Sequence, residues 1–122
     1  NEYAQFIGER RLAAIMFTDM VGFTTLAQRN EAHALEMLEE QTSLIRSFLK
    51  KYHGREVDTI GDGFLVEFAS SLDAVNCAVD IQSALKHKNA QRAEEERIWI
   101  RVGIHLGDII SRGAKVAGDA VN

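Results

Sequence analysis

Apolar residues along the chain form short uninterrupted runs and longer stretches with helical spacing. The apolar run at residues 12–18 stops at Asp19 and is followed by Gly22, a pattern typical of a buried central strand. Residues 1–10 have weak periodicity, so we interpret them as a lead-in and place a single domain at residues 11–122.

The next stretch predicts a long helix that begins after Asn30, a residue type that caps helices. Gly54 stands just past the predicted end, where helices often terminate. Six residues between them, five of them apolar, follow a spacing of three and four positions, which places them on one face. They are Leu35, Leu38, Thr42, Ile45, Leu49 and Tyr52.

Two strands are expected at residues 55–60 and 64–68, because Gly61-Asp62-Gly63 between them indicates a tight hairpin turn. Ser70 and Asp73 have the spacing of a capping box, which predicts the start of a second helix. The stripe expected to face the core consists of Val75, Ala78, Val79, Gln82 and Leu85.

The polar residues 86–96 predict a loop, with a frayed helical end at its beginning as the alternative. Residues 98–106 predict a further strand and residues 108–110 a short one. The order is then strand, helix, strand, strand, helix, strand. It predicts an α+β fold of the ferredoxin-like, split β-α-β kind, in which helices cover one face of an antiparallel, palm-type sheet.

Composition narrows the class of protein. The 122 residues are 46% apolar and carry a net charge of −4, so we expect a globular domain whose field attracts neither nucleic acid nor an anionic membrane. The single cysteine, Cys77, excludes an internal disulfide and favours a reducing, cytoplasmic compartment. No apolar run is long enough to cross a membrane, so membrane attachment would come only through regions outside this chain.

Two acidic residues carry the candidate chemistry. Asp19 ends the first strand, and backbone N–H groups in the turn with Gly22 can bind an anion such as phosphate. Asp62 stands at the hairpin tip, on strands that neighbour the first strand in a split β-α-β sheet. Two carboxylates that meet repel each other unless a cation lies between them, and oxygen ligands suit Mg²⁺ or Mn²⁺. The alternative is that both are ordinary turn residues.

Four segments extend this pattern: FTDMVGFT at 17–24, TIGDG at 59–63, RVGIHLG at 101–107 and GDAVN at 118–122. In this order they resemble the catalytic domain of the class III adenylate and guanylate cyclases. The resemblance covers roughly residues 10–122, and its first two segments are the most diagnostic. It implies conversion of a nucleoside triphosphate into a 3′,5′-cyclic nucleotide and pyrophosphate, in intracellular signal transduction.

By position, the resemblance implies a site for two divalent metal ions, Mg²⁺ or Mn²⁺. Asp19 and Asp62 match the metal-binding acids of the family, and the carbonyl of Met20 matches a further ligand. The triphosphate would rest on the backbone of Val21, Gly22, Phe23 and Thr24.

The resemblance assigns roles in the second half of the chain as well. Arg101 matches an arginine that contacts phosphate, with a solvated strand residue as the alternative, and Asn122 matches the asparagine that orients the ribose. In the family the ribose 3′-hydroxyl attacks the α-phosphorus with help from two metals, in a site that a homodimer shares. The transition-state arginine would lie four residues after Asn122, so we expect these 122 residues alone to be poorly active.

The base-binding positions depart from typical adenylate cyclases, which carry a lysine and an aspartate there. This chain has Asp58, four residues before Asp62, and Lys115, seven residues before Asn122. The reversed charges suit the donors and acceptor of guanine, whereas the frequency of adenylate cyclases in the family favours adenine. A third alternative is a salt bridge between Asp58 and Lys115 that leaves the base loosely bound.

Three other functions stay open. A weak or inactive cyclase homologue, serving as a nucleotide-binding regulatory or dimerisation domain, is favoured by the reversed base pocket. Another palm-type two-metal enzyme is the second, although the glycine-glycine-acid-acid signature of diguanylate cyclases is absent. The third is a dimerisation domain that binds no ligand.

Overall fold

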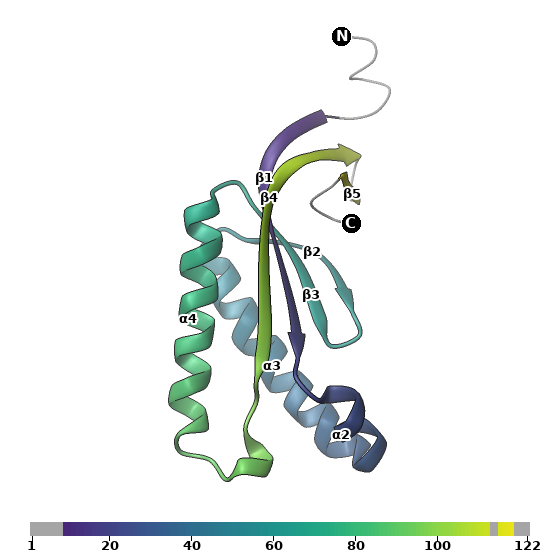
Figure 1. The fold of residues 1–122 in the computed structure, drawn as a ribbon, viewed down its shortest axis with the longest axis vertical. Helices are drawn as coiled ribbons and strands as arrows, with labels where there is room; N and C mark the ends of the chain where they lie inside the picture. Colours follow the sequence, from purple (N-terminus) through teal and green to yellow (C-terminus); the bar gives the residue numbers. More distant parts are fainter. Residues whose placement is uncertain (1–8, 113–114, 119–122) are drawn as a thin grey trace.

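The structure is a computed structural model that describes residues 9–112 and 115–118. Its strands form one antiparallel sheet (Figure 1). Its hydrogen-bonded strand order is β2-β3-β1-β4-β5. The strands are β1 (Glu9–Met20), β2 (Arg55–Ile60), β3 (Gly63–Phe68), β4 (Ile100–Arg112) and β5 (Lys115–Gly118).

Two long helices, α3 (Glu31–Lys51) and α4 (Ser71–Asn89), cover one face of this sheet (Figure 1). The short helix α2 (Phe23–Arg29) follows the end of β1, and the 3₁₀ turn η1 (Glu94–Glu96) precedes β4. The predicted α+β fold, with an antiparallel sheet and helices on one face, is confirmed. No helix in the described part of the chain has the length and apolar character needed to cross a membrane.

The central strand is β1, which lies between β3 and β4. Its apolar run predicted a buried strand, and Ala14, Ile15 and Met16 are fully buried. The strand begins at Glu9, inside the segment that we interpreted as a lead-in. The domain limit at residue 11 stays a prediction.

Helix α3 begins as predicted, because the side chain of Asn30 accepts a hydrogen bond from the N–H of His33 at 3.1 Å. Two residues of the predicted face, Ile45 and Leu49, are buried, whereas Leu35 is 53% exposed. In the first half of the helix the buried residues are Ala34 and Gln41, each one position before a residue of the predicted face.

The end of α3 differs from the prediction in one detail. The residue in the left-handed conformation is His53, with φ of 60°, and the N–H of Gly54 then donates to the carbonyl of Leu49 at 2.9 Å. Gly54 is needed for a different reason, since a Cβ there would lie 2.8 Å from the ring of Phe68.

Helix α4 differs from the prediction in its buried face and in its end. Val75 and Val79 are exposed, because the helix packs on the sheet through a neighbouring stripe with small residues that allow close approach. The buried stripe is Ala74, Cys77, Ile81, Leu85 and Asn89. The helix also continues through residues 86–89, where we expected a loop or a frayed helical end, and its last turn carries basic residues that suit a helix C-terminus.

Strand β4 is continuous to Arg112, so the break expected near Gly107 is absent. Gly107 pairs with Ala13 of β1, and the ladder runs on without interruption to Ser111 opposite Glu9. The outer half of β4 curves away from the helices (Figure 1). Neither β5 nor α2 was predicted.

Candidate functional site

The hairpin between β2 and β3 places Asp62 against the end of β1. Gly61 alone in this two-residue loop has a positive φ, 60°, as in a type II′ turn. A Cβ on Gly63 would lie 2.5 Å from the carbonyl oxygen of Thr18, so only glycine allows this close approach. The hairpin is therefore held in one position, where Asp62 Oδ2 accepts a hydrogen bond of 2.6 Å from the N–H of Met20.

Asp19 lies on the other side of this strand end, directly opposite Arg101 in the β1–β4 register. The guanidinium of Arg101 donates to both carboxylate oxygens, with Nε 2.9 Å from Oδ1 and Nη2 3.2 Å from Oδ2. This bidentate hydrogen bond raises the pKa of Arg101 further, so the guanidinium stays charged at all ordinary pH values. The two acids thus have different partners: a neutral N–H for Asp62 and a cation for Asp19.

The turn after Met20 leads into α2 through Gly22, whose φ is 76°. The N–H of Val21 donates to the carbonyl of Trp99 at 2.8 Å and anchors this turn beside β4. Gly22 offers no side chain to cap α2, and the first turn contains no acidic residue. The N–H groups at the start of α2 are therefore left to other acceptors, and anions are the acceptors that this end of a helix favours.

These elements enclose a cavity of about 290 Å³. Its lining contains most of the residues that the sequence singled out, and both acids are among them. The lining residues are Asp19, Met20, Gly22, Phe23, Thr24, Thr25, Asp62 and Arg101. Asp19 and Asp62 therefore line one cavity at the same end of the sheet.

The adenylate and guanylate cyclase catalytic domain family matches residues 8–118. The chain belongs to this family. A putative adenylate cyclase 3 from Rhizobium meliloti (strain 1021) is 38% identical over 115 residues, which are 93% of this chain and 19% of the relative. Retinal guanylyl cyclase 2 from Rattus norvegicus is 27% identical over 111 residues, 82% of this chain and 10% of the relative.

A solved structure, an adenylate/guanylate cyclase/hydrolase from Silicibacter pomeroyi, has the same fold. It superposes with a TM-score of 0.85 at 38% identity, over 93% of this chain and 67% of that one. The chain spans about a fifth or less of the curated relatives above.

One residue of the cyclase domain's cavity was missed by the sequence analysis. Thr25 lines the cavity beside Thr24, and its only signal was its place three residues after Gly22. Val21, which we had included in the triphosphate cradle, is 50% exposed and does not line the cavity with its neighbours.

The base-binding candidates lie elsewhere in the cyclase domain. Asp58 is an exposed residue of β2 whose Oδ1 accepts a hydrogen bond from the N–H of Thr59 at 2.8 Å. Lys115 begins β5, so the two residues belong to the two outer strands of the sheet. Asn122 lies outside the described residues. The three alternatives for the base pocket therefore stay predictions.

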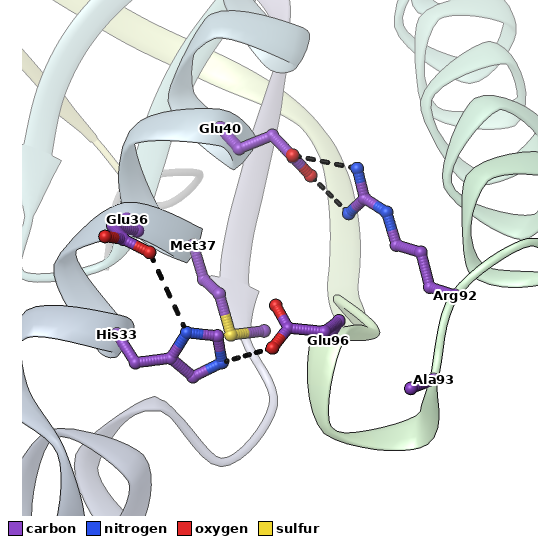
Figure 2. A pocket seen from close by; sticks show the side chains of 7 residues that line it. All are labelled: His33, Glu36, Met37, Glu40, Arg92, Ala93 and Glu96. Carbon is purple, nitrogen blue, oxygen red and sulfur yellow. Dashed lines mark hydrogen bonds and ion pairs between the residues drawn. The ribbon is translucent and has the colours of Figure 1, made fainter.

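A second cavity lies between the start of α3 and the connection that contains η1 (Figure 2). Arg92 Nη2 lies 2.8 Å from Glu40 Oε1, and this guanidinium lowers the pKa of the Glu40 carboxyl. His33 lies between Glu36 and Glu96: its Nδ1 is 4.0 Å from Glu36 Oε2, and its Nε2 is 3.6 Å from Glu96 Oε1. These contacts tie the α4–β4 connection to α3, and none of the residues singled out by sequence takes part.

Proposed function

We propose that this cyclase domain converts a nucleoside triphosphate into a 3′,5′-cyclic nucleotide and pyrophosphate by two-metal-ion catalysis. The observation that carries the proposal is the shared cavity of Asp19 and Asp62, with Arg101 and the start of α2 on its walls. Two carboxylates that can hold metal ions, a guanidinium and the N–H groups at a helix N-terminus are groups that stabilise phosphoryl transfer.

The donor set suits Mg²⁺ or Mn²⁺. Asp19 and Asp62 would supply hard carboxylate oxygens, and Met20, which lines the same cavity, would supply a backbone carbonyl. Over residues 9–112 and 115–118, no cluster of three or more His, Cys, Asp or Glu residues forms a complete metal cage. In a two-carboxylate site, substrate phosphates and water would complete the coordination of the ions. When bound, such ions acidify a hydroxyl and stabilise negative charge on phosphate.

The chain's own groups would hold and orient the triphosphate. The N–H groups at the start of α2 would donate to phosphate oxygens, and the exposed guanidinium of Arg101 would add a positive charge. A second copy of the domain would complete the site, with its Asn122 positioning the ribose and its Asp58 and Lys115 contacting the base.

The substrate is ATP or GTP. The relatives include proteins named adenylate cyclase and guanylyl cyclase. The charges at Asp58 and Lys115 suit guanine, and competition between the two nucleotides would separate the choices. Cytoplasmic signalling through the cyclic product is the role that we infer.

The test is turnover by the full-length protein with Mn²⁺ and either ATP or GTP. We expect cyclic nucleotide from the wild type, and a loss of at least about 100-fold in Asp19→Asn and Asp62→Asn. Glu39→Gln removes one exposed carboxylate of α3 and should leave turnover unchanged. Wild-type activity that survives both aspartate substitutions would contradict the proposal.

The second candidate is a nucleotide-binding homologue with little or no turnover, favoured by the reversed charges at Asp58 and Lys115. It predicts metal-dependent binding of a nonhydrolysable triphosphate, measured by calorimetry, without product from either nucleotide.

A further inference from the structure

Both carboxylate oxygens of Asp19 are engaged by one guanidinium. Arg101 donates through Nε and Nη2 at 2.9 and 3.2 Å, so the hydrogen bonds form a two-point contact. The β1–β4 register pairs these two residues directly, which means that the fold itself presents the cation to the acid. Asp62 differs, because its hydrogen-bond donor is the neutral N–H of Met20.

We propose that Arg101 competes with a divalent cation for Asp19 and is displaced when that cation arrives with the triphosphate. The inference rests on the proposed function and adds a step to it. A cation on Asp19 and a guanidinium across the same two oxygens repel each other, so occupation by one disfavours the other. Asp62 accepts its hydrogen bond from a neutral N–H and not from a guanidinium, so the cation would bind to Asp62 first.

The pair is weak enough to exchange. The side chain of Arg101 is 72% exposed and that of Asp19 is 47% exposed. An exposed ion pair changes an equilibrium constant by no more than about fivefold, since water screens both charges. The pair with Arg101 would therefore weaken cation binding at Asp19 by about this factor at most. The long side chain of Arg101 then remains beside the cavity, where its guanidinium can bind phosphate oxygens instead.

The exchange predicts effects of opposite sign in one variant. Arg101→Gln should bind Mn²⁺ alone more tightly than the wild type, because the competitor has gone. The same variant should bind the Mn²⁺ complex of a nonhydrolysable triphosphate more weakly, because the phosphate contact has gone. An arginine that only contacts phosphate, or only stabilises the fold, would not tighten the binding of free Mn²⁺.

The test is a titration of the full-length protein with Mn²⁺ in the absence of nucleotide, followed by electron paramagnetic resonance. We expect Arg101→Gln to lower the dissociation constant about two- to fivefold. Arg101→Lys should tighten binding as well, to a smaller extent, because an ammonium cannot span both oxygens. Arg29→Gln, which removes a charge from the last turn of α2, is the matched control and should leave the constant unchanged.

Unchanged or weaker Mn²⁺ binding by Arg101→Gln, in a variant with wild-type thermal stability, would overturn the inference. So would tightening in Arg101→Gln but not in Arg101→Lys, since that result assigns the effect to charge at a distance. The proposed function survives both of these outcomes. It fails together with the inference only when no variant, the wild type included, binds Mn²⁺ with or without the triphosphate.

Discussion

Asp62 accepts a hydrogen bond from the backbone N–H of Met20, 42 positions away in the sequence, at 2.6 Å. This bond joins the tip of the β2–β3 hairpin to the end of β1. It also places Asp62 beside Met20, the residue that follows Asp19. The relative position of the two carboxylates is therefore set by strand pairing and a turn, both of which belong to the sheet.

Gly63 is the residue on which that position depends. In Gly63→Ala the new Cβ would meet the Thr18 carbonyl at 2.5 Å, so β3 has to move away from β1. We expect the free energy of unfolding to fall by about 1–3 kcal/mol, measured by urea denaturation. Gly103→Ala is the control, because nothing lies within 4 Å of a Cβ there. Equal stability of the two variants would contradict this account of the hairpin.

Replacing His53 with glycine should stabilise the fold. It holds φ at 60°, a conformation that costs a residue with a Cβ about 1 kcal/mol. His53→Gly should therefore raise the free energy of unfolding by up to that amount and raise the melting temperature. His53→Ala keeps the Cβ and should give no comparable gain. A His53→Gly variant less stable than His53→Ala would show that the side chain contributes more than the backbone strain removes.

Asn89 links the end of α4 to Ile98, which lies just before β4 begins at Ile100. The residue is buried, its Nδ2 donates to the Ile98 carbonyl at 2.7 Å, and its Oδ1 accepts from the Ile98 N–H at 2.9 Å. Asn89→Ala leaves both backbone groups without these partners, so we expect a loss of about 2 kcal/mol or more in chemical denaturation. Asn76→Ala changes an exposed asparagine of the same helix and should cost far less. Similar losses in both would mean that helix propensity, not the Asn89–Ile98 contact, sets the cost.

The buried thiol of Cys77 should make the stability of the fold depend on pH in the alkaline range. Burial raises the pKa of its thiol from 9.0 to about 11, with a smaller contribution from the Asp80 carboxylate. Between these values the unfolded chain loses the proton and the folded chain keeps it, so stability falls as pH rises, by at most about 1.4 kcal/mol per unit.

Urea unfolding of wild type and Cys77→Ala at pH 8 to 11 isolates this contribution. The substitution lowers stability at every pH, but the wild type should lose more stability than the variant as pH rises above 9. Parallel curves for the two proteins would contradict a protonated, buried thiol.

The sequence predicted the elements that depend on local pattern. The apolar run of residues 12–18, the cap at Asn30 and the glycines around Asp62 each indicated their structure directly. Strand neighbours then implied that Asp19 and Asp62 meet.

Other features could not be predicted, for identifiable reasons. Helix α2 has seven residues and two threonines, and begins at a glycine in place of a capping side chain, so its local signal is weak. In α4, two adjacent stripes contain apolar residues, and packing against the sheet decides between them. The pairing of Arg101 with Asp19 depends on a strand register between residues 82 positions apart, which no local pattern contains.

The central claim is that Asp19 and Asp62 together hold divalent ions under a triphosphate. The most direct measurement is the number of Mn²⁺ ions bound per domain in the full-length protein with a saturating nonhydrolysable triphosphate, by electron paramagnetic resonance. We expect two ions in the wild type and fewer in both Asp19→Asn and Asp62→Asn, with Glu39→Gln unchanged. The same ion count and affinity in both aspartate variants as in the wild type would contradict the claim.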